Sequence, residues 1–567
     1  MSQNDLVVRF AGEGGAGMLT IAETLVQAAT KSGYHGLTFA TFPSQIMGGP
    51  TWMQARISSE PVLSSGDTLD VLVALNRYNY DAHVSEVRDG GIIIHDSSFE
   101  VPRSDNTLSI PTNDLAKKAG LVLSANMVII GAIAHLVNWP LELFETYIAN
   151  RFRAKGEEII NANCKALALG FEHAAETNIT LGSLPPPNKI DHDQLLIKGN
   201  DALCLGALKA EVDTFVGYPI SPASTILMFM LRNLKGVGKF AYQASSEIES
   251  ISAIIGASYA GKKSMTATAG PGFSLMSEGI GLAWMTETPL VIVNVQRGGP
   301  ATGLPTKTEQ SDLYAAMTPA HGDVRLPIIA PGTVEECFHA GVEAFNWAER
   351  YQGPVIILSE HNLSERSQNI PKPDLSTIVL EKRSVYTGDN GYHRYEGTDV
   401  SPMPIPGNPG SYIANASEHD PMGDTTHLPE RHIQMTQRRF NKLELLHDGV
   451  YESKNTDSAI AIMPWGGSKG PALETYNQLI TDGHDLAWYY TMFLHPLPPK
   501  LVDELKEKTL VLVPELNYQG QFSSILRTYG INAESITQYT GLPFKVKDLY
   551  VLIKDRTEYF AHEKTTV

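Results

Sequence analysis

The chain has 567 residues, of which 43% are hydrophobic and 19% are charged, a composition typical of folded proteins and not of disordered ones. At roughly 150 residues per domain, this length predicts about three or four domains. Lysine and arginine together number 44 against 62 acidic residues, which gives a net charge of −18. This acidity argues against binding to nucleic acid or to an anionic membrane, because both require a basic surface.

The N-terminal sequence and the cysteines bear on compartment and redox role. No apolar run reaches the roughly 18 residues of a membrane span, and the first residues lack a signal-peptide pattern, so we expect a cytoplasmic protein. Cys164, Cys204 and Cys337 are scattered and form no CxxC motif. Such thiols predict no disulfide framework. Three cysteines are also too few for an all-cysteine iron–sulfur cluster, which needs about four cysteine ligands. If the protein takes part in electron transfer, we expect the cluster on another chain.

The first predicted unit, residues 1–182, alternates strands and helices, which is typical of an α/β fold. Its expected elements are, in chain order, a strand at Leu6–Ala11, a helix at Met18–Ser32, buried parallel strands at Val71–Leu75 and Gly91–His95 and a helix at Asn126–Leu136. A proline-rich stretch at 183–194 is predicted to be an interdomain linker.

Two more α/β units are expected, at 195–366 and 451–567, with an extended connector at 367–450 between them. The connector is rich in proline and glycine, and its segment 401–410 cannot hold regular structure for long. The expected elements of the two units are helices at Asp201–Lys209, Ser250–Gly261 and Leu275–Trp284 and strands at Thr214–Tyr218, Ser264–Thr268, Leu290–Val295, Pro354–Leu358, Ala459–Met463 and Leu510–Val513. The predicted fold class is therefore α/β, with several doubly wound domains.

The glycine-rich start, GEGGAG at 12–17, stands between a predicted strand and a predicted helix. Its spacing superficially matches dinucleotide-binding motifs, because glycines let backbone amides approach a phosphate at a helix N-terminus. A simple tight turn explains the glycines equally well, and the acidic residue that would bind the ribose is not evident. A second glycine cluster, FPSQIMGGP at 42–50, suggests a site or interface for something other than NAD.

Three segments of the unit at 195–366 carry candidate chemistry. Prolines 219 and 222 fix the backbone around Ser221, which would present its hydroxyl at a rigid strand end; a helix cap would explain the same residues. Glu247 lies in the first turn of a predicted helix. A carboxylate there either complements the helix dipole or faces a ligand.

The third segment begins with the TATAGPG loop at 266–272. Arg297 comes shortly after the strand expected next, Leu290–Val295. Its guanidinium suits a carboxylate, and glycines and two threonines, but no acid, lie near it in sequence. It could instead pair structurally with a distant acidic residue. Because open α/β sheets bind ligands at the carboxyl ends of their strands, we expect these loops to line one pocket.

The motifs of this unit occur in a specific order: YPISPAS (218–224), SSEIESISAIIGASYAG (245–261), TATAGPG (266–272) and QRGGPATGLPTKTEQSDL (296–313). Together they resemble the α subunit of the 2-oxoacid:ferredoxin oxidoreductases, above all the 2-oxoglutarate branch with γ and α domains fused on one chain. The resemblance extends over essentially the whole length. It implies a γ-type oxidoreductase domain at 1–182, a pyrimidine-binding domain of thiamine diphosphate enzymes at 195–366 and, from ELNYQGQ at 515–521, a transketolase C-terminal-like domain at 451–567.

The resemblance also implies a role for each candidate residue. Glu247 would act on N1′ of the aminopyrimidine ring and promote the imino form of thiamine diphosphate. The residues expected to bind the substrate are Ser221, Arg297, Thr302 and Thr306. Those expected to bind the cofactor are Tyr218, Pro219, Ile220, Glu247 and Gly270. Those expected to bind coenzyme A or form an interface are Gly14, Gly15, Gly17, Ser44, Met47 and Gly48.

The resemblance further predicts partners. The chain has no GDG…N motif for Mg²⁺ and the diphosphate and no cluster cysteines, and in the family both belong to a β subunit. We therefore expect thiamine diphosphate to be shared with a β subunit that carries Mg²⁺ and a [4Fe-4S] cluster, in an (αβ)₂ heterotetramer. The expected reaction interconverts 2-oxoglutarate, coenzyme A and oxidised ferredoxin with succinyl-CoA, CO₂ and reduced ferredoxin.

One residue departs from the family pattern and leaves the choice of substrate open. Met47 stands where γ domains often carry a lysine or arginine that can help bind the substrate or coenzyme A. Without that cation, pyruvate or a branched-chain 2-oxoacid stays possible; nearby Arg56 is expected on a strand surface. The sequence also leaves open two functions of a different kind, an NAD-dependent dehydrogenase that uses GEGGAG and a non-catalytic scaffold subunit.

Overall fold

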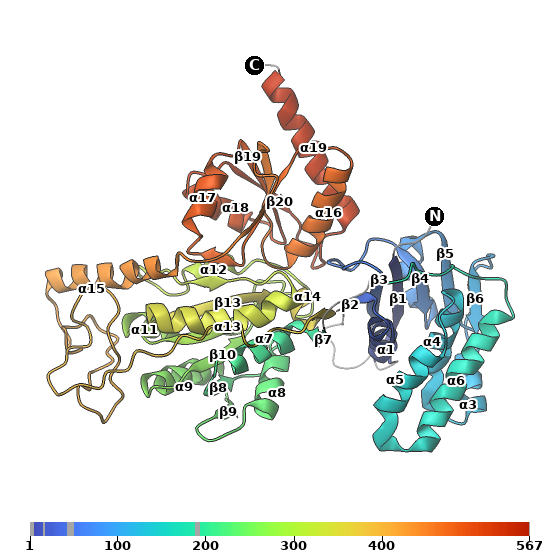
Figure 1. Cartoon of the computed structure of the whole chain (residues 1–567), viewed down its shortest axis with the longest axis horizontal. Helices are drawn as coiled ribbons and strands as arrows, with labels where there is room; N and C mark the ends of the chain where they lie inside the picture. The colour runs from blue at the N-terminus through green and yellow to red at the C-terminus, as the bar shows by residue number, and fades with distance from the viewer. Residues whose placement is uncertain (1–4, 15–16, 42–49, 188–192, 566–567) are drawn as a thin grey trace. The chain divides into compact units, whose positions relative to one another are not determined.

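The computed structural model describes residues 5–14, 17–41, 50–187 and 193–565. The chain divides into two compact units (Figure 1), the first made of residues 1–197 with 366–372 and the second of 198–365 with 373–567. Within the described ranges, no helix is both long enough and apolar enough to cross a bilayer.

The first unit is built on an eight-stranded sheet, the N-terminal sheet, in the order β6-β5-β4-β1-β3-β2-β14-β7. Its strands are β1 (Asp5–Glu13), β2 (His35–Thr41), β3 (Pro50–Ser58), β4 (Leu69–Ala74), β5 (Val87–Asp96), β6 (Thr107–Ile110), β7 (Gln194–Lys198) and β14 (Ser367–Pro371). The expected parallel strands β4 and β5 do pair in parallel, and β4 pairs in parallel with β1. The sheet is mixed because β3 runs antiparallel to both its neighbours, β1 and β2.

Helices cover the N-terminal sheet: α1 (Met18–Lys31), α2 (Arg77–His83), α3 (Thr112–Ala119), α4 (Ala125–Leu136), α5 (Glu142–Phe152) and α6 (Glu157–Ala175). Almost every residue of α4 is buried, which agrees with its nearly continuous apolar sequence. Helices α4 and α6 pack closely (Figure 1) because each has a glycine at the contact. A Cβ at Gly131 would overlap the Leu167 carbonyl oxygen, and one at Gly170 would overlap that of Val128.

The second unit contains a seven-stranded sheet, the central sheet, in the order β18-β12-β13-β11-β10-β8-β9. Its strands are β8 (Thr214–Gly217), β9 (Phe240–Gln243), β10 (Ser264–Thr268), β11 (Leu290–Gln296), β12 (Ile328–Ile329), β13 (Pro354–Glu360) and β18 (Phe493–His495). All the pairs from β9 to β12 are parallel, and only β18 joins its neighbour antiparallel. The helices of this part are α7 (Gly199–Lys209), α8 (Ser224–Asn233), α9 (Glu247–Tyr259), α10 (Gly270–Leu275), α11 (Ser277–Met285), α12 (Leu313–Met317), α13 (Val334–Tyr351) and α14 (His361–Glu365).

The same unit contains a five-stranded sheet, the C-terminal sheet, in the order β15-β17-β16-β19-β20. Its strands are β15 (Glu452–Lys454), β16 (Ile460–Ile462), β17 (Ala487–Tyr490), β19 (Leu510–Glu515) and β20 (Ala533–Thr537), and its helices are α16 (Lys469–Thr481), α17 (Pro499–Lys506), α18 (Gln521–Thr528) and α19 (Val546–Thr565). Strand β18 comes from this stretch of sequence yet pairs with β12, so the two sheets share one body.

The segment expected as an extended connector, 367–450, contains more regular structure than its composition suggests. It begins with β14 and ends with helix α15 (Pro429–Asn441), beside which its loops run (Figure 1). An ion cluster anchors it: the buried Glu287 carboxylate accepts from Arg438 Nε at 2.8 Å and lies 3.0 Å from Lys442 Nζ and 3.7 Å from an Arg394 nitrogen. Although burial opposes it, these cations hold the pKa of Glu287 well below its usual range.

Candidate active site

The loops that carry the predicted site residues leave the central sheet at one edge. Ser221 follows β8, Gly270 begins α10 after β10, and Arg297 follows β11. Because these strands are parallel neighbours, their carboxyl ends meet at the same edge of the sheet. Glu247 reaches this edge from the first turn of α9, which follows β9.

Glu247 is a buried carboxylate turned toward the loop after β10. Helix α9 is capped by the hydroxyl of Ser246, which accepts from the Glu249 amide at 3.2 Å. Glu247 itself is only 5% exposed, and its carboxylate makes no hydrogen bond within the described chain. A Cβ added at Gly272 would overlap both Glu247 Oε1 and the hydroxyl of Thr268. The glycine therefore makes the room that this carboxylate occupies.

Glu249, the second carboxylate of the same turn, has a different environment. It accepts from the Ser245 amide at 2.7 Å, from the Ser245 hydroxyl at 2.6 Å and from the Tyr242 hydroxyl at 3.0 Å. The Ser245 hydroxyl contributes most to lowering the pKa of Glu249. Glu249 thus closes the start of the helix, and Glu247 is the carboxylate that faces the sheet edge.

The Arg297 guanidinium is nearly buried and is oriented by backbone carbonyls. It donates to the carbonyl oxygen of Ser221 at 2.7 Å and more weakly to that of Thr302 at 3.4 Å, and its buried Nε has no partner among the described residues. Burial lowers the pKa of Arg297, and the charge of Asp312 opposes this. No acid stands near Arg297 in the sequence, but the charge of Asp312, fifteen residues further along the chain, acts on it, as the alternative of a distant acidic residue allowed.

Sequence reasoning missed Asp312. Asn294 Nδ2 donates to its carboxylate at 3.1 Å, and the carboxylate lies against Gly270, where a Cβ would come within 3.0 Å of Oδ2. Burial raises the pKa of Asp312, while the Asn294 hydrogen bond and the Arg297 charge oppose the rise. The signal in the sequence was its place at the end of the motif that begins with Arg297.

The loop after β11 folds back on itself. Gly298 and Leu304 form an antiparallel bridge, and the Gly298 amide donates to the Lys307 carbonyl at 3.1 Å. The tip of the loop is exposed, so Thr302 contributes a carbonyl to Arg297 while its side chain faces solvent. Thr306 is half-buried on the return of the loop, close to its base.

Lys307 and His361 join Arg297 at the base of this loop, and sequence reasoning identified neither. His361 begins α14 after β13 and is buried. Burial, followed by the charges of Lys307 and Arg297, lowers the pKa of His361 to about 4, so the ring is neutral. Burial also lowers the pKa of Lys307. Two cations, Arg297 and Lys307, therefore act on one uncharged imidazole at this edge.

The remaining expected site residues lie in the partly exposed turn after β8 or in the first unit. Tyr218, Pro219 and Ile220 form the partly exposed turn between β8 and Ser221, whose own side chain is exposed. In the first unit, Gly14 lies in the turn after β1. Gly17 begins α1 with φ +80, where a side chain would be strained and would overlap Asn126. The expected positions Gly15, Ser44, Met47 and Gly48 lie outside the described residues.

Arg56, considered as a substitute for the missing cation, is an ordinary strand arginine. Its Nε donates to the Asp5 carboxylate at 2.7 Å and its Nη1 donates to the Ser64 hydroxyl at 2.8 Å. This pairing agrees with the expected strand-surface position.

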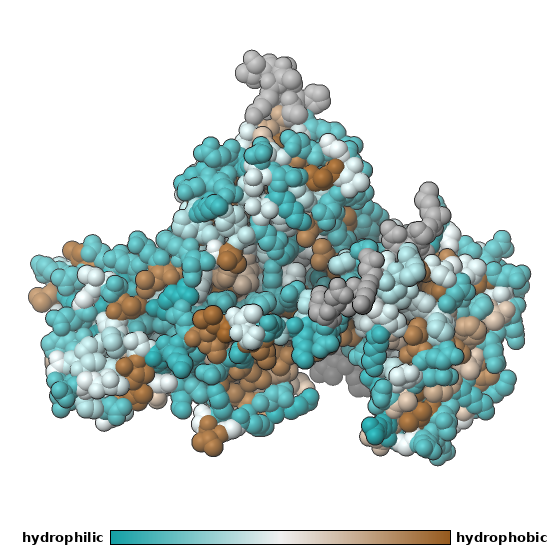
Figure 2. Space-filling model, in the orientation of Figure 1, coloured by the Kyte–Doolittle hydropathy of each residue, from teal (hydrophilic) through white to brown (hydrophobic). Residues whose placement is uncertain are grey.

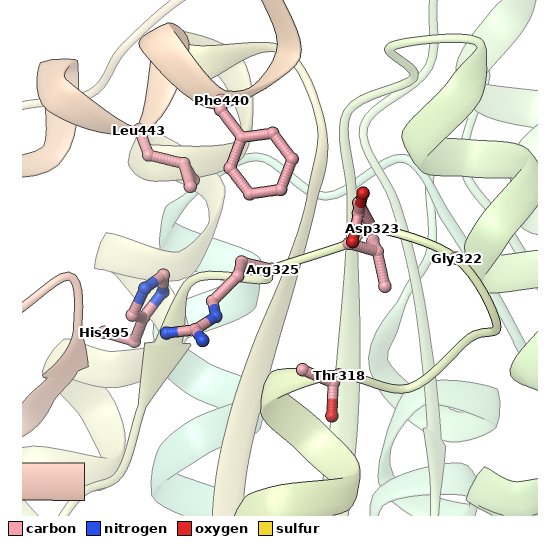
Figure 3. A pocket seen from close by; sticks show the side chains of 8 residues that line it. Thr318, Gly322, Asp323, Arg325, Phe440, Leu443 and His495 are labelled. Carbon is pink, nitrogen blue, oxygen red and sulfur yellow. The ribbon is translucent and has the colours of Figure 1, made fainter. Parts of the chain in front are cut away.

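A separate cavity of about 530 Å³ lies elsewhere in the second unit. Figure 3 shows Arg325 beside His495, with Phe440 and Leu443 on the opposite wall. The His495 ring bonds the Leu326 carbonyl through Nδ1 at 2.9 Å, and burial lowers its pKa to about 4. None of the candidate residues at the sheet edge lines this cavity.

Known proteins resemble the chain over almost its whole length. Residues 205–438 match the thiamine diphosphate-binding family model of pyruvate flavodoxin/ferredoxin oxidoreductases, and residues 7–173 match the pyruvate ferredoxin/flavodoxin oxidoreductase model. The chain is 30% identical to the 2-oxoglutarate oxidoreductase subunit KorA of Mycobacterium tuberculosis, covering 96% of this chain and 90% of that one. It belongs to the 2-oxoacid:ferredoxin oxidoreductase α subunits.

Other members of the 2-oxoacid:ferredoxin oxidoreductase family agree. Subunit alpha of 2-oxoacid:ferredoxin oxidoreductase 2 of Aeropyrum pernix is 26% identical, covering 95% of this chain and 96% of that one. A solved 2-oxoglutarate:ferredoxin oxidoreductase from Magnetococcus marinus, with 2-oxoglutarate, coenzyme A and succinyl-CoA bound, superposes with a TM-score of 0.93 at 35% identity, covering 98% and 99% of the two chains. The predicted family and α/β fold class are confirmed, and the relatives' names as subunits indicate a multi-subunit oxidoreductase.

The residues at the sheet edge fit the ring end of thiamine diphosphate, the cofactor that this oxidoreductase family's domain binds. The decisive feature is the buried Glu247 carboxylate, which has no hydrogen-bond partner within the described chain and is set over a glycine. A nearly buried carboxylate that finds no donor in the described chain can take one from a ligand, and a protonated ring nitrogen is such a donor.

Proposed function

We propose that this chain supplies the pyrimidine-binding and substrate-binding half of the active site of a thiamine diphosphate-dependent 2-oxoglutarate:ferredoxin oxidoreductase. The reaction interconverts 2-oxoglutarate, coenzyme A and oxidised ferredoxin with succinyl-CoA, CO₂ and reduced ferredoxin. The observation that carries the proposal is the placement of a buried, unpaired Glu247 and a nearly buried Arg297 at one sheet edge. The names of the relatives and the ligands of the Magnetococcus marinus enzyme support the choice of 2-oxoglutarate and coenzyme A.

Glu247 has the central role toward the cofactor. When bound, thiamine diphosphate supplies the electron sink that lets a 2-oxoacid lose CO₂. The Glu247 carboxylate would accept a hydrogen bond from the ring nitrogen N1′ and hold a proton on that atom. The turn at Tyr218, Pro219 and Ile220 and the loop at Gly270 leave the same edge and would line the cofactor.

Arg297 would bind the carboxylate next to the reacting carbonyl. Within the described chain its buried Nε has no partner, and its Nη1 donates to the Ser221 carbonyl, so the guanidinium is already oriented. An ion pair made in so desolvated a place is stronger than one in water. The hydroxyl of Ser221 and the side chain of Thr306 belong to the same two loops and would contact the 2-oxoacid beside it.

The other half of the site would come from a β subunit. Beside Glu247, the edge strand β9, α8, α9 and α10 present large exposed apolar side chains: Met228, Phe240, Tyr242, Ile248 and Leu275. Figure 2 shows hydrophobic surface gathered on this side of the unit, around β9, β10 and α8. Such a patch marks an interaction surface. We assign Mg²⁺ and the [4Fe-4S] cluster to this partner, and the pair of chains to an (αβ)₂ heterotetramer that reduces ferredoxin.

The test is electron output by the complex purified with its native partner. Anaerobic viologen reduction is measured with coenzyme A and a panel of 2-oxoacids, for the wild type, Glu247→Gln and the matched control Glu249→Gln. We expect activity with 2-oxoglutarate, a loss of about 100-fold or more in Glu247→Gln and near-normal activity in Glu249→Gln. Undiminished activity of Glu247→Gln, or turnover by this chain without a partner, would contradict the proposal.

A further inference from the structure

A second cation stands at the base of the loop that carries Arg297. The Gly298 amide donates to the Lys307 carbonyl at 3.1 Å, which places the backbones of Arg297 and Lys307 next to each other. Both charges act on the buried His361 ring, so the two side chains lie around the same neutral imidazole. The charge of Lys307 therefore acts on the same part of the sheet edge as that of Arg297.

The C-terminal sheet fixes the stem of Lys307. The Thr308 amide donates to the Gly541 carbonyl at 3.2 Å, in the loop after β20. A Cβ at Gly541 would lie 2.9 Å from Lys307 Cβ and 3.2 Å from its Cγ, so the lysine stem passes directly over this glycine. This contact fixes the first carbons of the lysine stem, and the residue as a whole is half-buried.

The described chain does not neutralise Lys307. No carboxylate of the described residues lies within the 4.0 Å of an ion pair with its ammonium group. The acids of the same motif have other partners: Glu309 receives the Gly299 amide and the Ser311 hydroxyl, and Asp312 receives Asn294. A half-buried cation without a partner is costly, and an anionic ligand would offset that cost.

We propose that Lys307 binds the distal carboxylate of a dicarboxylic 2-oxoacid, while Arg297 binds the carboxylate beside the carbonyl. This inference rests on the proposed function and deepens it by assigning the substrate class to a residue of this chain. A monocarboxylic 2-oxoacid would occupy Arg297 and leave Lys307 unpaired, whereas a dicarboxylate meets both cations. A cation at Met47 is then not required for the choice of a dicarboxylate.

The experiment compares Lys307→Met and Lys307→Arg in the complete complex. Anaerobic viologen reduction gives kcat and KM for 2-oxoglutarate, pyruvate and coenzyme A, and calorimetry gives the affinity for 2-oxoglutarate without coenzyme A. In Lys307→Met we expect kcat/KM for 2-oxoglutarate to fall by roughly 30-fold, mainly through KM, with the affinity falling in parallel. Turnover of pyruvate stays within about 2-fold, and Lys307→Arg restores most of the loss because it keeps the charge. The control Lys500→Met, at an exposed lysine of α17, leaves every parameter unchanged.

Any of three different results overturns the inference. Equal losses for 2-oxoglutarate and pyruvate would make Lys307 a structural residue. A rise confined to the KM for coenzyme A would make it a phosphate ligand. Unchanged kinetics would remove it from the site. If the wild-type complex turned over no 2-oxoacid at all, the proposed function itself would fail, and this result is distinct from every variant result.

Discussion

Two residues of one helical turn, Glu247 and Glu249, differ in which carboxylate faces the sheet edge. Residues two apart on a helix point to nearly opposite sides, so one carboxylate faces the sheet edge and the other faces the exposed start of α9. The sequence motif distinguishes them only by counting from the family pattern, whereas the space above Gly272 distinguishes them physically. Asp312 shares the motif of Arg297, but its effect on the guanidinium depends on the folded-back loop, which the motif alone does not reveal.

Gly272 offers a test of this arrangement at the scale of one methyl group. In Gly272→Ala the new Cβ would overlap Glu247 Oε1 and the Thr268 hydroxyl, both of which are ends of movable side chains. We therefore expect the carboxylate to be displaced while the backbone holds, with a loss of about 100-fold in kcat. Viologen reduction and the thermal unfolding midpoint are measured together.

The matched control is Gly281→Ala in α11, where the nearest atom to the new methyl would be the Ala320 Cβ at 3.2 Å. It should keep its activity. Normal activity of Gly272→Ala would show that the room above this glycine has no role in holding Glu247.

At the scale of elements, the sequence predicted best the strands that consist of continuous buried apolar runs. Strands β10, β11 and β13 are continuous buried runs and match the expected ranges within a residue or two. The helix expected at Leu275–Trp284 is divided at Met276 into α10 and α11. Helix α15 was missed because its sequence, PERHIQMTQRRFN, is mostly polar and its buried face consists of Met435 and two arginines, Arg438 and Arg439. These arginines are buried by pairing with acids, which no hydrophobic pattern signals.

The ion cluster at Glu287 predicts how α15 and the connector are held. Glu287→Gln would leave Arg438, Arg394 and Lys442 buried around a neutral amide, which we expect to lower the free energy of unfolding by about 3–5 kcal/mol. Because the folded-state pKa of Glu287 lies below its unfolded value of 4.5, the wild-type advantage is complete above that pH and declines as the pH falls below it. Urea unfolding from about pH 3 to about pH 8, at about one-unit steps, measures this difference on both sides of the unfolded value.

Glu444→Gln is the control and should not change stability, because Glu444 is exposed in the short helix that follows α15. A Glu287→Gln variant as stable as the wild type at neutral pH would mean that the cluster does not hold the connector.

At the scale of the second unit, one buried glutamine joins the central sheet to the C-terminal sheet. Gln310 Oε1 accepts from the Ser468 hydroxyl at 2.8 Å and the Leu516 amide at 2.9 Å, and its Nε2 donates to the Trp465 carbonyl at 2.8 Å. Its own carbonyl accepts from Asn517 Nδ2 at 3.1 Å. The ELNYQGQ motif, which indicated the type of the C-terminal domain in the sequence, thus binds the end of the loop that carries Arg297 through Gln310.

The same joint predicts coupling between the stability of this unit and the substrate site. Gln310→Leu keeps the volume but leaves the Leu516 amide, the Trp465 carbonyl and the Ser468 hydroxyl without their partner. Each buried group left unpaired costs about 1–3 kcal/mol. With three such groups, we expect the free energy of unfolding in urea to fall by roughly 3–6 kcal/mol. The exposed Gln478→Leu in α16 serves as the control. Because Gln310 lies three residues beyond Lys307, the loosened loop should also raise the KM for the 2-oxoacid before unfolding begins. A variant that loses stability yet keeps this KM would show that the loop is positioned by its own backbone bridge rather than by the C-terminal sheet.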